Sequence, residues 1–123
     1  MTLTASIEHL STKIITGLFW RKYCLNEFRL HIANDGDVTL RPLHFHIDTI
    51  SASLLVHSNL SQSDAPCERV ADNHFECEIV ELPVAEEKDY LWSVRSALKV
   101  DYDLVLTVDP HNNPVRASYH FTG

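Results

Sequence analysis

Apolar and polar residues alternate over most of the chain, and this period of two is typical of strands that bury one face. Phe28, Leu30 and Ile32 have this spacing, with Arg29 and His31 between them. The alternation recurs over residues 2–9, 43–47, 50–57, 75–79, 90–94, 102–108 and 115–121. Without a convincing long helix, these roughly seven or eight short strands predict an all-β fold, a two-sheet antiparallel sandwich.

Polar stretches separate the predicted strands. Residues 34–37 read Asn-Asp-Gly-Asp, and we predict a turn in which Gly36 supplies positive φ. Further loops are expected over residues 58–66, 82–89 and 109–114. No repeat, low-complexity tract or linker divides the sequence, so residues 1–123 are expected to fold as a single domain.

Residues 10–24 form the ambiguous segment of the chain. Ile14, Leu18 and Phe19 fit one face of a helix, whereas Gly17 and the threonines and aromatic residues around it favour extended backbone. We predict an irregular crossing with strand character. Its aromatic residues form either an exposed platform or a cap over one end of the core, and we favour the cap.

Composition and charge narrow the classes of function. Hydrophobic residues make up 45% of the chain, which is ordinary for a folded domain. The formal net charge is −7 at pH 7 and the ten basic residues are scattered along the sequence, so no nucleic-acid partner is expected. No stretch approaches the roughly 18 apolar residues of a spanning helix, so we expect no membrane insertion. The start lacks the features of a signal peptide, which leaves a cytoplasmic protein or a domain cut from a longer exported chain.

The chain has three cysteines. Cys67 and Cys77 are close enough in sequence for a local disulfide, and the charged loop between them favours this bridge over reduced, buried thiols. A bridge that closes a loop of this size contributes about 3 kcal/mol to stability. Cys24 is then left over, and we expect a buried free thiol rather than a nucleophile, because no base is evident beside it.

Three stretches of the chain together resemble a known family. They are Asn34-Asp-Gly-Asp-Val-Thr-Leu40, then Cys67-x9-Cys77-x4-Leu82-Pro83, then Tyr102-x-Leu104-x-Leu106-x-Val108. This arrangement, over about residues 25–110, is similar to the immunoglobulin-like repeat domains of bacterial and archaeal surface proteins, of the cell-adhesion-related bacterial type. The chain departs from that family at Ala85-Glu86, where glycine is usual. The resemblance implies an immunoglobulin-like sandwich without catalytic residues, acting as a stalk or adhesion module outside the cell.

Among the eight histidines, His44 and His46 are the best candidates for metal ligands, because they share one face of a predicted strand. In an immunoglobulin-like strand order, residues 40–48 and 115–122 lie on either side of a common neighbouring strand, and His120 then joins the same outer face. Imidazoles are ligands for Zn or Cu, so these three residues are our candidate metal site. The simpler interpretation is that outward strand positions are merely polar.

Trp20 and Tyr23 are the candidate ligand-binding residues, because an exposed aromatic platform suits sugar stacking or a protein partner. The sequence contains no serine-hydrolase elbow, phosphate-binding loop or His-Glu-x-x-His motif. We therefore expect no enzymatic activity, no catalytic residues and no cofactor.

Our prediction from the sequence is a non-enzymatic immunoglobulin-like module of a larger exported protein, with a structural, adhesion or protein-interaction role. Its partner is expected to be a protein or a cell surface. The alternative is a small module that binds a carbohydrate through surface aromatics or a metal through the histidines. A third class is a cytosolic protein with a ligand cavity between its sheets. The pattern leaves the oligomeric state open, because the edges of a sandwich can pair.

Overall fold

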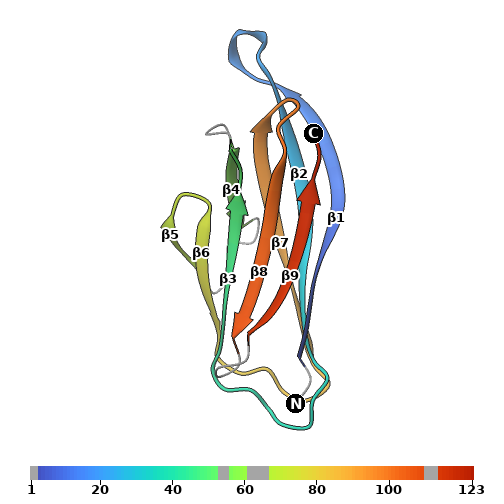
Figure 1. Cartoon of the computed structure of the whole chain (residues 1–123), viewed down its shortest axis with the longest axis vertical. Coiled ribbons are helices and arrows are strands. Elements are labelled where there is room, and N and C mark those ends of the chain that lie inside the picture. The colour runs from blue at the N-terminus through green and yellow to red at the C-terminus, as the bar shows by residue number, and fades with distance from the viewer. Residues whose placement is uncertain (1–2, 53–55, 61–66, 110–113) are drawn as a thin grey trace.

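The computed structural model of the chain describes residues 3–52, 56–60, 67–109 and 114–123. They form two facing antiparallel sheets (Figure 1). The first sheet has the order β1 (Leu3–Thr16), β2 (Lys22–Asn34), β7 (Glu87–Ala97) and β4 (Val56–Leu60). The second has the order β5 (Cys67–Ala71), β6 (His74–Ile79), β3 (Leu43–Ile50), β8 (Tyr102–Asp109) and β9 (Val115–Phe121). The predicted two-sheet sandwich is confirmed, with nine strands in the described part of the chain.

The core lies between the sheets and is built from the strand positions that the alternation predicted. The inward residues of β2, β3, β7 and β8 are almost completely buried, and each large apolar side chain of this kind contributes roughly 1.5–3 kcal/mol. Trp92 packs edge-on against Phe75 with ring centroids 4.9 Å apart, and Phe45 lies 5.4 Å from Tyr90. These contacts join the two sheets. The apolar positions of the alternating pattern are therefore the ones that pack against each other in the core.

Asn34 closes the end of the sandwich that lies opposite the β1–β2 tip. Its side-chain amide donates to the carbonyl oxygens of Val38 at 2.9 Å and Leu82 at 3.0 Å. Leu82 also pairs with Leu40 in an isolated bridge. The predicted turn is present, but Gly36 does not have positive φ; its N–H donates to the Asn34 side chain instead. An Asx-type hydrogen bond thus replaces the backbone freedom expected of glycine.

The disulfide predicted between Cys67 and Cys77 is present, and it joins directly opposite residues of β5 and β6. Cys24 is a buried free thiol, as expected. The expected strand neighbours are also confirmed, because β3 and β9 both flank β8. Residues 58–60 belong to β4 rather than to a loop. Parts of three expected segments, residues 53–55, 61–66 and 110–113, lie outside the described residues.

The ambiguous segment at residues 10–24 is the main correction to the sequence-based interpretation. It forms a regular hairpin, in which β1 pairs with β2 from Leu3–Asn34 to Thr16–Lys22, with one irregularity near His9. The β-branched isoleucines and threonines of this segment favour extended backbone, and that preference outweighs the short helical stripe. Figure 1 shows the tip of this hairpin standing beyond the ends of the other strands. Within the part of the chain that the structure describes, no helix has the length and apolar character needed to cross a bilayer.

Candidate functional site

The tip of the β1–β2 hairpin presents three large apolar side chains to solvent. Leu18, Phe19 and Trp20 are 85%, 90% and 87% exposed. They make up the short turn η1 (Leu18–Trp20), which the N–H of Arg21 closes by donating to the Leu18 carbonyl at 3.4 Å. The favoured interpretation that Phe19, Trp20 and Tyr23 cap the core is therefore wrong for Phe19 and Trp20. The hairpin continues past the end of the sandwich, so no facing layer covers its tip.

The backbone of this turn is one that aromatic residues adopt with difficulty. Phe19 has φ 59° and ψ 29°, and Trp20 has φ 64°. Two successive positive φ values correspond to a type I′-like hairpin turn, for which Asn-Gly is the preferred sequence. A bulky residue in this region costs about 1 kcal/mol or more. Neither ring is buried in return, so the stability of the fold does not explain why aromatic residues occupy these positions.

A shallow basic pocket of about 310 Å3 lies at the base of the tip. Its lining residues come from β2, β4, β7 and the position just before β2: Arg21, Lys22, Tyr23, His57, Arg95, Ser96 and Ala97. The Arg95 guanidinium lies over the Tyr23 ring, 5.4 Å from its centroid. None of these lining residues is a carboxylate. Tyr23, one of the predicted ligand-binding residues, thus lies in the basic pocket, whereas Trp20 lies in the apolar tip.

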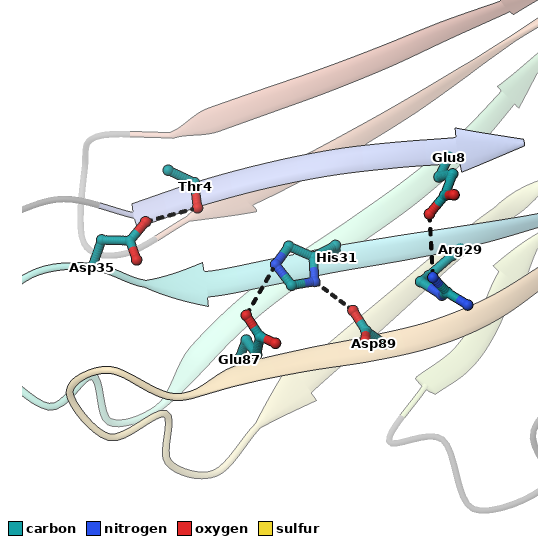
Figure 2. A network of polar contacts seen from close by, with 7 residues as sticks. All are labelled: Thr4, Glu8, Arg29, His31, Asp35, Glu87 and Asp89. Carbon is teal, nitrogen blue, oxygen red and sulfur yellow. Dashed lines mark hydrogen bonds and ion pairs between the residues drawn. The ribbon is translucent and has the colours of Figure 1, made fainter.

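The outer face of the first sheet shows how charges are arranged elsewhere on the domain (Figure 2). His31 lies between two carboxylates, with Asp89 at 2.5 Å and Glu87 at 3.4 Å. Arg29 pairs with Glu8 at 3.2 Å. By contrast, among the described residues no ion pair forms with Arg21, Lys22 or Arg95. The basic charge at the base of the tip is therefore not neutralised by the residues that the structure describes.

A second pocket, of about 480 Å3 and mainly apolar, opens at the same end of the sandwich. Its lining includes Ile14, Cys24, Leu98, Val100 and Phe121. Ser96 also lines it, and the Ser96 hydroxyl is buried without a hydrogen-bond partner among the described residues. Of the described pockets, this one best matches the third class of function considered above, a protein with a ligand cavity between its sheets.

Asn26 organises a buried polar network beside the apolar pocket. Its amide donates to the Tyr102 hydroxyl at 2.9 Å and to the Cys24 sulfur at 3.4 Å. Its carbonyl oxygen accepts from Thr12 at 2.5 Å and from His9 at 3.0 Å. Burial raises the pKa of Tyr102, and the Asn26 hydrogen bond partly offsets this, so the phenol stays neutral. The network links the two sheets, because Asn26 lies on β2 and Tyr102 on β8.

The structure does not bring the three candidate metal ligands together. His46 lies opposite Thr107 of β8, whereas His120 lies opposite Asp103, four residues further along that strand. At about 3.3 Å per residue this offset is about 13 Å, in addition to the separation across β8. Within the described residues, no group of three His, Cys, Asp or Glu side chains is arranged to hold a metal ion.

Three histidines of the second sheet, His46, His74 and His120, are instead engaged with neighbouring carboxylates. His120 contacts Asp103 at 2.6 Å, and His74 is hydrogen-bonded to Asp48. The pKa of His74 is raised, mainly by the hydrogen bond to Asp48 and further by Glu76, although partial burial opposes this. The sequence did not single out His74, because its carboxylate partner lies on a different strand of the sheet.

Comparison with known proteins supports the fold and goes no further. No family model and no curated protein matches the sequence. Among solved structures, the chain is similar to the CARDB domain of a Pyrococcus furiosus protein, which was crystallised with di-metal ions. The two sequences are 15% identical, the match covers 98% of this chain and 86% of that one, and the TM-score is 0.61. AvmM, a macrocyclization catalyst of alchivemycin A biosynthesis, also matches at 15% identity over 98% of this chain and 89% of its own, but its TM-score of 0.41 carries no argument. The chain therefore has an immunoglobulin-like β-sandwich fold resembling the CARDB domain.

Proposed function

We propose that the chain is a non-enzymatic interaction module, part of a longer exported protein, that attaches to its partner through the tip of the β1–β2 hairpin. The observation that carries this proposal is the exposure of Leu18, Phe19 and Trp20 on a turn that favours smaller residues. A surface of large aromatic residues, beside arginines that form no ion pair within the described part of the chain, has the composition of an interaction hot spot. The disulfide supports an oxidising compartment, because such bonds are rare in the cytosol.

The metal-binding alternative is not proposed. The similar CARDB domain was crystallised with di-metal ions, but in this chain His120 lies far from His44 and His46. A sugar-stacking role through Trp20 and Tyr23 is also less well supported. Arg95 lies over the Tyr23 ring within the basic pocket, so that face of the ring is not free for a sugar to stack on.

Attachment of the fluorescently labelled domain to cells of the organism that produces it tests the role of the tip. The variant L18S/F19S/W20S should lose attachment, because it removes the exposed apolar side chains without disturbing the core. The matched control, V38S/V70S/V80S, removes three exposed valines elsewhere on the surface and should attach normally. Equal attachment of the tip variant and the control would contradict the proposed function.

The proposed location needs a separate measurement. An antibody raised against the domain should detect the native protein in the cell-surface fraction, at a mass larger than that of the 123-residue domain. In the domain itself, thiol labelling of the denatured, unreduced chain should modify only one of the three cysteines. A native protein of domain size with three free thiols, found in the cytosol, would contradict this part of the proposal.

A further inference from the structure

We propose that the partner of the β1–β2 tip is an anionic lipid bilayer. In this arrangement the apolar tip enters the interfacial layer, and the basic pocket beneath it contacts the phosphate headgroups. The inference rests on the proposed function, because it names the partner of the same surface. It concerns shallow, peripheral contact, whereas the sequence-based expectation of no membrane insertion concerned a spanning segment.

The shape of the apolar surface favours a bilayer. Leu18, Phe19 and Trp20 follow one another on a convex turn that projects from the body of the domain (Figure 1). A protein partner needs a groove complementary to this knob, whereas a bilayer accommodates projecting side chains of any shape. Tryptophan in particular partitions to the boundary between headgroups and acyl chains. Apolar residues on the membrane side with Lys and Arg next to them are typical of interfacial anchors.

The distribution of charge agrees with an anionic surface. Two chain segments at the tip end, residues 9–26 and 93–100, contain no Asp or Glu, although the whole chain has seventeen; the exposed Asp101 follows directly after the second segment. The same segments hold half of its ten basic residues: Lys13, Arg21, Lys22, Arg95 and Lys99. The rest of the domain is therefore strongly acidic and is repelled by an anionic bilayer. These opposite charges orient the domain with its tip toward the membrane.

The basic pocket provides contacts suited to a headgroup. Arg21, Lys22, His57 and Arg95 surround a shallow volume of about 310 Å3 directly below the apolar turn. Arginine binds phosphate through paired N–H donors, and lysine adds a further positive charge. Because these cations form no ion pair within the described residues, headgroup phosphates do not have to displace a carboxylate from them.

Vesicle binding tests the inference, and the protein carries its own reporter. Trp20 is exposed and Trp92 is completely buried, so entry of the tip into lipid should shift the Trp20 emission to the blue while Trp92 stays unchanged. The probes are vesicles of phosphatidylcholine alone and of phosphatidylcholine with roughly one-third phosphatidylglycerol. We expect binding at least about tenfold tighter to the anionic vesicles, with a further decrease in affinity at high salt.

Two pairs of variants separate the apolar and the charged contributions. R21S/K22S should weaken binding to anionic vesicles about 25-fold, since each basic residue near such a surface strengthens binding about fivefold. K88S/R116S removes the same charge at exposed positions away from the tip and should change the affinity by less than about twofold. Because L18S/F19S/W20S lacks the Trp20 reporter, its binding and that of V38S/V70S/V80S are measured by co-sedimentation with the vesicles. The first variant should lose at least about tenfold in affinity and the second almost nothing.

The outcomes distinguish this inference from the proposed function. Equal binding to neutral and anionic vesicles, or binding that the tip variants leave intact, overturns the lipid assignment. Cell attachment that depends on the tip without vesicle binding also overturns it, and points to a protein or glycan partner while the proposed function stands. Far-ultraviolet circular dichroism of every variant shows whether it is folded, so a lost interaction is not confused with a lost structure.

Discussion

Replacing Phe19 with Asn and Trp20 with Gly should stabilise the domain slightly while it removes the binding element. The two residues have φ of 59° and 64°, and relief of this strain is worth about 1 kcal/mol at each position. Asn-Gly is the preferred pair for such a turn. The change thus improves the local backbone at the expense of the two most exposed aromatic rings.

Two losses of stability oppose this gain, and both are small. At 90% and 87% exposure, each ring buries only a minor part of its surface, so its loss costs about 0.5 kcal/mol. Introducing Gly raises the conformational entropy of the unfolded chain, which lowers the free energy of unfolding by about 0.5–1 kcal/mol. The expected net effect of F19N/W20G is therefore between zero and about 0.5 kcal/mol of stabilisation. If the rings capped the core instead, their removal would cost about 3–5 kcal/mol each.

Urea unfolding measures this difference directly. With Trp20 removed, the fluorescence comes from the fully buried Trp92 alone, and linear extrapolation gives the free energy of unfolding. A loss of more than about 2 kcal/mol would refute the claim that the tip is uncovered. Retained binding to anionic vesicles by a fully folded F19N/W20G variant would refute the claim that these rings carry the interaction.

Three further changes test other parts of the structure. Asn26→Ala should lower the free energy of unfolding by about 2–4 kcal/mol, because the buried Tyr102 hydroxyl loses its donor; urea unfolding measures this, and an unchanged value would rule out the network. The pKa of His74 should lie above its ordinary value of 6.5 and return toward it in Asp48→Asn, as an NMR titration of the imidazole would show. Because the raised pKa favours the protonated folded state, this stabilisation is full below pH 6.5 and fades as the pH rises through the folded-state pKa; a stability difference between wild type and D48N that is independent of pH would contradict it. Reducing the β5–β6 disulfide should cost about 3 kcal/mol, and identical urea midpoints with and without reductant would disprove that contribution.

The local alternation of apolar and polar residues was sufficient to predict the two-sheet sandwich. The alternation at Phe28, Leu30 and Ile32 identified the buried face of β2, because neighbouring side chains of a strand always point to opposite sides. Cys67 and Cys77 were also identified as a pair, since residues so close in sequence meet across a hairpin. Both properties depend on backbone geometry over a few residues, so the spacing of residues in the sequence is enough to predict them.

The candidate site depended on relations between distant segments. The strand register places His120 about four residues from the level of His46, and no local signal contains that offset. The exposure of Trp20 results from the hairpin extending past the facing sheet, which depends on where the other strands end. Arg21 and Arg95 meet at one pocket only because β2 pairs with β7. The sequence by itself therefore determined which residues face the core, whereas long-range strand pairing decided which surface residues lie together.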